Sequence, residues 1–435
     1  MDAKRRKREA DSLHEQSSIN AMLPHMSYMY SPPSIPHMSY MYSPLPPISH
    51  MTHMYSPLPP ISPYLSPLSQ PLTNAYSESY LPVQHNPVQP VSTFARMATE
   101  RQTNNQIDLF FVDMQGRINV MWVVGTGNWQ GPVALTGPNT ASPAAYLVTE
   151  RQTDNQIDLF FVDMQGRINV MWVVGTGNWQ GPVALTGPNT ADPWGKLVTE
   201  RQTDNQIDLF FVDLQGRINV MWVVGTGNWQ GPVSLTGPNS AHEWAKLATE
   251  RQTDNQINLF FVDKQGRINV MWVVGTGNWQ GPVPLTGPNT VHDLASLETQ
   301  RQTNNQIDLF FVDLQGRVNV MWVVGTGNWQ GPVPLTGPNY SNSGASIATE
   351  RQTDNQIDLF FVDNQGRINV MWVVGTENWQ GPVPLTGPNT ASRFTELVTQ
   401  RQTHNQIDLF FVDNFGRINV MWVVGTGNWQ GPVPL

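Results

Sequence analysis

The sequence has no cysteine, few charged residues and no long apolar run. The absence of cysteine among 435 residues excludes disulfide bonds, thiolate metal sites and cysteine nucleophiles. The longest purely apolar stretch in each repeat is short, Val120 to Val124 in the first copy. A transmembrane helix needs ~20 such residues, so no membrane span is expected. The basic start, Lys4 to Arg8, is followed by no hydrophobic segment and does not predict a secretory signal.

Residues 1–92 are predicted to form a disordered extension. Between residues 26 and 71 the phrase Met-Ser-Tyr-Met-Tyr-Ser-Pro recurs with variants, and proline at this density removes backbone donors and fixes φ. Neither a helix nor a sheet propagates through such a segment. Its Pro-rich phrases are candidate contacts for protein partners, and an inert spacer is the favoured alternative.

The basic run Lys4 to Arg8 is typical of a nuclear-import address, with a merely solvated basic terminus as the alternative. The expected location is therefore cytoplasmic or nuclear.

From about residue 97 the sequence repeats itself every 50 residues. Each copy opens with Arg-Gln-Thr-X-Asn-Gln-Ile, first at Arg101, and ends in Asn-Trp-Gln-Gly-Pro-Val. Seven copies fit, and a fixed period of this length indicates a repeat architecture. We therefore predict a folded domain over residues 93–435.

One repeat predicts four short strands, at 147–153, 156–163, 167–174 and 182–185, with a tight turn over 163–166. The second and third strands are apolar on both faces, so each sheet has to be covered on both sides. A ring of sheets covers every one of them with its neighbours and leaves only short edges. The predicted fold class is all-β, a seven-bladed β-propeller of 50-residue, four-stranded blades.

The alternative to a ring is an open stack, which exposes two apolar end faces and needs atypical capping repeats. The first and last copies carry no polar end-face substitutions. The register places the entering strand inside and the leaving strand outside, so blades one and seven are expected to meet by side-chain packing.

The repeats offer no catalytic or metal-binding constellation. The three histidines of the folded part, His242, His292 and His404, lie at unrelated or variable positions, and no Ser/His/Asp arrangement recurs. The Asp-X-Gln-Gly turn has too few oxygen ligands for calcium, and a turn-capping aspartate is the favoured reading. We expect no enzyme, no metal and no cofactor. The repeats are also acidic, with a net formal charge of −10, so nucleic acid is not an expected partner.

Aromatic and polar residues at fixed positions form the most informative set. Trp122 lies mid-strand among apolar residues, and inter-blade core is its favoured role. Trp129 follows Asn128 in a loop, where an indole face stays partly open. Arg117 and Asn119 are two apart on one strand and project to the same face. Sugars are bound by an aromatic face and by such hydrogen-bonding side chains. The equally weighted alternative is an Arg117–Asp113 salt bridge with Trp129 closing the outer edge of the blade.

The candidate carbohydrate-binding residues recur in all seven copies. They are Arg117, Asn119, Asn128, Trp129, Arg167, Asn169, Asn178, Trp179, Arg217, Asn219, Asn228, Trp229, Arg267, Asn269, Asn278, Trp279, Arg317, Asn319, Asn328, Trp329, Arg367, Asn369, Asn378, Trp379, Arg417, Asn419, Asn428 and Trp429.

The blade sequence resembles that of a known lectin family. The strings Asn-Gln-Ile-Asp-Leu-Phe-Phe-Val-Asp, Gly-Arg-Ile-Asn-Val-Met-Trp and Asn-Trp-Gln-Gly-Pro-Val-Ala-Leu-Thr-Gly are similar to the blade pattern of seven-bladed propeller lectins of the Photorhabdus lectin type. Fungal seven-bladed lectins are a more distant comparison. The resemblance covers about residues 97–435, and Trp122 and Trp129 match the pattern best. It implies shallow pockets between adjacent blades that bind monosaccharides such as fucose or its O-methylated forms.

The leading hypothesis is a non-enzymatic, multivalent carbohydrate-binding protein whose partners are glycans or glycoconjugates. The rival is a protein–protein interaction scaffold that uses the variable linkers between copies and the Pro-rich tail.

Overall fold

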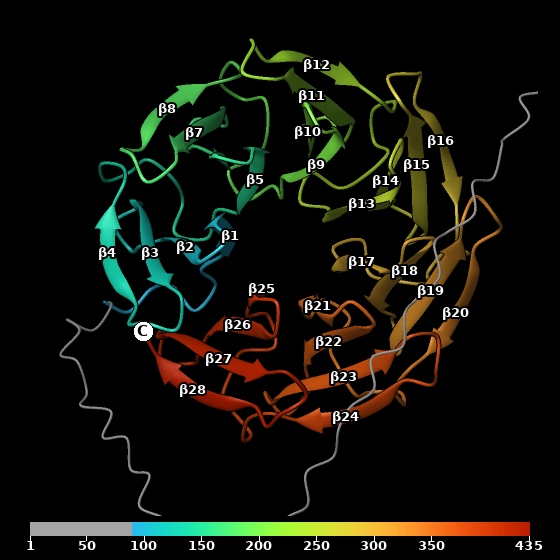
Figure 1. The fold of residues 1–435 in the computed structure, drawn as a ribbon. Helices are drawn as coiled ribbons and strands as arrows, with labels where there is room; N and C mark the ends of the chain where they lie inside the picture. Colours follow the sequence, from blue (N-terminus) through green and yellow to red (C-terminus); the bar gives the residue numbers. More distant parts are fainter. Residues whose placement is uncertain (1–88) are drawn as a thin grey trace, which may run out of the picture. The chain divides into compact units, whose positions relative to one another are not determined.

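The computed structural model describes residues 89–435. The predicted disorder of the tail, its Pro-rich phrases and its basic run lie outside the described residues, apart from residues 89–92. Within residues 89–435 the regular secondary structure consists of 28 strands in seven four-stranded antiparallel sheets. The sheets follow one another around a ring (Figure 1). The predicted all-β, seven-bladed propeller is confirmed. No helix among these residues is long and apolar enough to cross a bilayer.

Each blade uses its strands in chain order from the axis outward, and we number the blades 1 to 7 along the chain. The innermost strands are β1 (Met97–Thr103), β5 (Leu147–Thr153), β9 (Val198–Thr203), β13 (Leu247–Thr253), β17 (Leu297–Thr303), β21 (Ile347–Thr353) and β25 (Leu397–Thr403). The second strands are β2 (Gln106–Val112), β6 (Gln156–Val162), β10 (Gln206–Val212), β14 (Gln256–Val262), β18 (Gln306–Val312), β22 (Gln356–Val362) and β26 (Gln406–Val412).

The third strands are β3 (Ile118–Val124), β7 (Ile168–Val174), β11 (Ile218–Val224), β15 (Ile268–Val274), β19 (Val318–Val324), β23 (Ile368–Val374) and β27 (Ile418–Val424). The outermost strands are β4 (Gln130–Ala134), β8 (Gln180–Ala184), β12 (Gln230–Ser234), β16 (Gln280–Pro284), β20 (Gln330–Pro334), β24 (Gln380–Pro384) and β28 (Gln430–Pro434).

The outer strand begins earlier than its sequence predicts. Strand β8 begins at Gln180 rather than Pro182, because Gln180 pairs with Trp172 on the far side of a register shift. The proline inside this exposed edge strand has no N–H to offer. Such an edge resists pairing with another chain.

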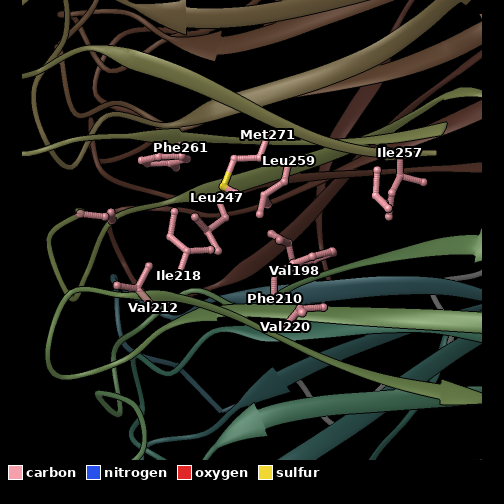
Figure 2. Packing of buried hydrophobic residues seen from close by; sticks show 13 residues of the cluster. Val198, Phe210, Val212, Ile218, Val220, Leu247, Ile257, Leu259, Phe261 and Met271 are labelled. Atoms are coloured by element: carbon pink, nitrogen blue, oxygen red, sulfur yellow. The ribbon is translucent and has the colours of Figure 1, made fainter. Parts of the chain in front are cut away.

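The hydrophobic core lies between blades rather than within them. Phe210 and Ile218 of blade 3 pack with Leu259 and Met271 of blade 4, as Figure 2 shows. The next residue along the strand, Phe211, belongs to the cluster shared with blade 2. Successive side chains of a strand point to opposite faces, so the two adjacent phenylalanines contribute one ring to the core shared with each neighbouring blade. Burying each such phenylalanine contributes about 1.5–3 kcal/mol relative to leaving it exposed.

Hydrogen bonds also join each blade to the next around the axis. The hydroxyl of Thr199 donates to the carbonyl oxygen of Thr149 at 3.2 Å. The equivalent bond forms at all seven junctions and includes the one from Thr99 to the Thr399 carbonyl, at 3.1 Å. A closed circle of seven bonds therefore surrounds the axis.

The junction between blades 7 and 1 is completed by the segment 89–96. The Val91 N–H donates to the Gly416 carbonyl at 2.8 Å, as the Ala141 N–H donates to the Gly116 carbonyl at 3.1 Å inside the ring. Val91 is buried in the cluster shared by blades 7 and 1. The two blades share no strand. Side-chain packing closes the ring, as the sequence predicts, and the Val91–Gly416 and Thr99–Thr399 hydrogen bonds add to it.

Candidate functional site

The two ends of a blade carry different parts of the repeat. At one end, the β2–β3 turn meets the linker to the next blade, where the Asn139 N–H donates to the Gln115 carbonyl at 2.9 Å. At the other end, the β1–β2 turn meets the β3–β4 loop, where the Gly125 N–H donates to the Asn105 carbonyl at 2.6 Å. We call these the turn face and the loop face.

On the turn face, Asp113 organises the β2–β3 turn. One carboxylate oxygen accepts the backbone N–H groups of Gln115 at 2.9 Å and Arg117 at 3.0 Å. The other accepts the Arg117 Nε–H at 2.7 Å and the Asn119 amide at 3.1 Å. Burial pushes the pKa of Asp113 upward, but these hydrogen bonds outweigh it and hold the pKa below its usual value. Asp113 therefore stays charged, and the turn is fixed from within.

Glycine completes this turn for a steric reason. Gly116 has φ +73°, and a Cβ at this position would lie 2.5 Å from the Ala141 carbonyl oxygen of the linker. Because the linker runs so close, the turn and the linker are held as one unit.

The Arg–Asp pair occurs at 2.7 Å in all seven blades. This is the salt bridge that the sequence left open as an alternative. The Arg117 side chain stays 42% exposed, and one of its terminal nitrogens donates to the Gln115 side-chain oxygen at 3.4 Å, whereas Asn119 is buried.

A cavity of about 320 Å³ lies beside this turn in blade 3, between the turn and the incoming linker. Its polar lining includes the Arg217 side chain, and Ser234 hydrogen-bonds Asn219 at 2.7 Å on its wall. The lining residues are Asn189, Thr190, Phe211, Asp213, Leu214, Gln215, Arg217, Asn219, Pro232 and Ser234. We call this the turn pocket.

Asn128 and Trp129 lie on the loop face, at the opposite end of β3 from Arg117 and Asn119. Four residues of strand separate Asn119 from the level of Trp129, and seven separate Arg117 from the level of Asn128, roughly 13 to 23 Å. The structure therefore brings Arg117 together with Asn119, and Asn128 together with Trp129, but it does not bring the two pairs together. The same division holds in every blade.

The loop tryptophan packs between blades. Trp129 meets Phe410 of blade 7 edge to face, with ring centroids 5.4 Å apart, and Trp179 meets Phe110 of blade 1 at 5.3 Å. Asn128 is exposed beside it. The indole is half-buried, so one part of it stabilises the junction and the rest remains accessible.

A second half-buried indole reaches each junction. Trp122 of blade 1 and Trp179 of blade 2 pack against the same buried cluster, together with Leu135. The other six junctions carry the same two tryptophans, including the closing one, where Trp422 meets Trp129. We call each such pair a tryptophan junction.

Polar side chains flank the strand tryptophan. Gln130 lies directly opposite Trp122 on the neighbouring strand, and Asp108 lies opposite it on the other side. Cross-strand partners project to the same face, so an exposed amide and a buried carboxyl accompany the indole. Burial raises the pKa of Asp108 to about 6, although the hydrogen bond from Gln106 opposes the rise. The assembly offers an aromatic surface with hydrogen-bonding groups beside it.

Trp122 and Gln130 were not among the predicted binding residues. The sequence favoured Trp122 as inter-blade core, and it does pack there, but it also stays partly open. The alternation of side chains along β3 places Trp122 on the same face as Val120, toward the next blade, and this pattern could have indicated that Trp122 lies at a junction. Gln130 could be recognised only from the pairing of β3 with β4, and the sequence predicts the start of the outer strand two residues too late.

Comparison with known structures identifies the family. The fold and sequence are similar to those of the BP39L lectin from Burkholderia pseudomallei, with 36% identity and a TM-score of 0.76 over 78% of this chain and 99% of that lectin. The chain belongs to the BP39L lectin family. The predicted resemblance to seven-bladed propeller lectins is thus confirmed. No protein-family model matches the sequence, and no curated protein matches it.

A fungal relationship is visible at the level of fold. AofleA from Arthrobotrys oligospora is 12% identical, with a TM-score of 0.51 over 77% of this chain and 90% of that protein. At this identity the likeness extends to the fold alone.

Proposed function

We propose that the protein is a multivalent lectin that binds one monosaccharide unit at each tryptophan junction. Membership of a lectin family supports carbohydrate binding. The observation that carries the choice of site is the pair of half-buried indoles at all seven junctions. An indole face contacts the C–H side of a sugar ring, and an amide such as that of Gln130 binds its hydroxyl groups.

The aromatic lining favours sugars with added apolar surface. Each buried methylene or methyl group contributes about 0.8 kcal/mol. The 6-methyl group of fucose, or a methyl group on a sugar oxygen, supplies such a group where glucose has a hydroxyl. The preference for added methyl groups agrees with the ligands that the family resemblance implies, so we propose fucose and O-methylated sugars as the ligands.

Seven equivalent sites on one rigid ring raise the overall affinity for a glycan-covered surface. Linking sites that are individually weak increases avidity ~10²–10⁴-fold when several bind at once. The proposal includes no catalytic step. The carboxyl group opposite Trp122, that of Asp108, accepts a hydrogen bond from Gln106, and Asp113 lies on the turn face.

The test compares two sevenfold variants in calorimetric titrations with methyl α-L-fucoside. The first replaces the Trp122 position in every copy by phenylalanine, which keeps an aromatic group in the junction but shortens the sugar-contacting face. We expect at least tenfold weaker binding. The matched control replaces the Arg117 position in every copy by lysine, on the other face, and should bind within twofold of the parent. The opposite pattern would place the sugar in the turn pocket and overturn the proposed site.

A protein-interaction scaffold is the second candidate, favoured by large exposed side chains on the variable linkers such as Trp194 and Phe394. It predicts partners that bind the ring without any glycan and are not displaced by fucose. For the tail, we propose the cytoplasmic or nuclear location expected from Lys4 to Arg8. A fluorescent fusion with and without that run tests it, and unchanged distribution would remove the nuclear address.

A further inference from the structure

The linker before blade 6 carries an aromatic residue at a position that is small elsewhere. Tyr340 stands where the linkers before blades 2 to 5 and blade 7 have threonine or serine, for example Thr190 before blade 3. Thr190 lines the turn pocket of blade 3. Tyr340 is therefore placed to reach the equivalent pocket of its own blade.

The Tyr340 ring packs against the aromatic wall of that pocket. It meets Phe361 edge to face, with ring centroids 5.8 Å apart. Phe361 is the counterpart of Phe211, which lines the turn pocket of blade 3. Tyr340 is half-buried and belongs to the edge of the core cluster shared by blades 5 and 6. Blade 6 thus fills this place with a side chain of the protein itself.

The polar lining of the pocket is more covered in blade 6 than in the other blades. The Arg367 side chain is 29% exposed, the lowest value among the seven Arg–Asp turns, against 36% for Arg217 in blade 3. Pro382 is half-buried, whereas its six counterparts, such as Pro232, are exposed. These differences mark the place that the Tyr340 ring takes.

The hydroxyl group of Tyr340 lies near the Arg–Asp pair of the turn. Burial raises the pKa of Tyr340, the Asp363 carboxylate raises it further, and the Arg367 guanidinium lowers it. A phenol hydroxyl both donates and accepts hydrogen bonds, so it suits a neighbouring carboxylate and guanidinium. The pocket therefore offers an aromatic wall and two polar groups to one phenolic ring.

In blade 3 the same place is open. Thr190 is smaller than tyrosine, and a cavity of about 320 Å³ remains beside it. The turn tip Leu214 has no polar group that would bridge to the linker, whereas Lys264 of blade 4 donates to Asn239 at 3.0 Å. Ser234 adds a hydroxyl group to the wall. Blade 3 has the wall, the charged pair and the space, but not the ring.

We propose that the turn pocket of blade 3 binds a phenolic ring in the place that Tyr340 takes in blade 6. The ring packs against Phe211, and its hydroxyl group lies at the Asp213–Arg217 pair, as an aromatic wall with a few polar groups favours. The site goes beyond the proposed sugar sites at the tryptophan junctions and does not depend on them.

The chain itself is one source of such a ring. In blade 6 the ring belongs to the pair Tyr340-Ser341. The part of the chain before residue 89 contains the same Tyr-Ser pair four times, at Tyr30, Tyr42, Tyr55 and Tyr76. The Val91 N–H donates to the carbonyl oxygen of Gly416 in the blade 7 turn, so this part of the chain joins the ring on the turn face. A free phenol is the other source.

The experiment is equilibrium dialysis of the full chain against N-acetyl-L-tyrosinamide, which measures the probe bound per chain at saturation. Thr190→Tyr copies the blade 6 arrangement into blade 3 and should lower that number by one. Tyr340→Thr opens the blade 6 pocket and should raise it by one. The matched control Thr190→Ser copies the residue found at Ser240 and should keep the parent value. N-acetyl-L-phenylalaninamide, which lacks the hydroxyl group, should bind at least threefold more weakly.

A second chain, with leucine in place of the four tyrosines of the Tyr-Ser pairs before residue 89, separates the two sources. If those tyrosines fill the pocket, the probe binds this chain at least threefold more tightly than the parent. If a free phenol is the ligand, the two affinities are equal. Either result supports the site when Thr190→Tyr, made in the same chain, removes one bound probe.

Three results would overturn the proposal. They are the absence of saturable binding in both chains, an unchanged number of bound probes in Thr190→Tyr, and equal binding of N-acetyl-L-leucinamide. Thermal unfolding checks that each variant is folded. Titration with methyl α-L-fucoside runs in parallel, and its result at the tryptophan junctions leaves the phenol result unaffected.

Discussion

The rim of the ring and its axis differ in how closely the seven copies agree in sequence. At the rim, every junction repeats the same two tryptophans and the same Arg–Asp turn. At the axis, the circle of threonine hydrogen bonds repeats in all seven copies, but the last linker position before each inner strand varies: it holds Arg96, Tyr146, Lys196, Lys246, Ser296, Ser346 and Glu396. The charges of each Arg–Asp turn pair within their own blade, so identical charges of different blades are not forced together at the rim. Side chains at the axis converge, and seven like charges there would repel one another. Repetition is therefore compatible with the rim but costly at the centre.

The largest effect is expected in the core that joins blades. Phe210→Ala removes a fully buried ring between blades 3 and 4 and the edge contact of Trp279, 5.3 Å away. We expect a loss of about 3–5 kcal/mol in the free energy of unfolding. Denaturant titration measures it. The control is Phe415→Ala, since Phe415 is 75% exposed at a turn, and it should change stability by less than about 0.5 kcal/mol. Equal losses would contradict an inter-blade core.

The Arg–Asp turn should affect stability without affecting sugar binding. Asp213→Ala leaves the Gln215 and Arg217 N–H groups and the Arg217 guanidinium without their acceptor. We expect a loss of ~1–3 kcal/mol. Thermal unfolding measures this loss, and fucoside titration should show the parent affinity at the other six blades and at blade 3. A fucoside site count reduced by one would show that the turn belongs to the binding site.

The axial carboxyl groups should make the ring more stable in mild acid. Burial raises the pKa of Glu200 to about 8, with repulsion from Glu250 next, and raises the pKa of Glu250 to about 7. A carboxyl group whose pKa is raised in the folded state contributes its full stabilisation only below its pKa in the unfolded chain, near 4.5. That stability is lost as the pH rises through 7 to 8. Carboxylates such as Asp113 have lowered pKa values, and their effect lies below pH 4, outside this range.

The melting temperature should therefore fall between pH 5 and pH 8. Glu200→Gln should raise the melting temperature at pH 8 by about 2–4 °C, the shift expected for ~1 kcal/mol, and leave it nearly unchanged at pH 5. The chain already carries glutamine at this position in blades 5 and 7, as Gln300 and Gln400, so the substitution is tolerated sterically. A variant that is less stable than the parent at pH 8 would contradict the claim that the ionised Glu200 carboxylate destabilises the fold.

The smallest effect is expected for a rim position that already varies. Ala134→Pro copies the residue found at Pro284, and both pair with the same asparagine position of the third strand. Melting temperature and fucoside affinity should both stay within error of the parent. A loss above about 0.5 kcal/mol would show that rim copies are not interchangeable.

Much of the fold follows from the sequence because its pattern is local. The apolar Phe-Phe strand, the Asp-to-Gly turn and the 50-residue period determine the strands, the covered faces and the number of blades. The site follows less well. Arg117 and Trp129 are twelve residues apart in the sequence, but β3 holds them at opposite ends. The meeting of Trp194 with Trp244, and of Lys196 with Glu298, depends on the ring geometry, which no single repeat contains.

A crystal structure of the full chain with methyl α-L-fucoside tests the central claim most directly. The account predicts the sugar ring between the Trp122 and Trp179 indoles, and at the equivalent pair of other junctions, with the Gln130 amide bonded to a hydroxyl group. Fucoside bound beside Arg217 in the turn pocket, with the tryptophan junctions empty, would contradict it.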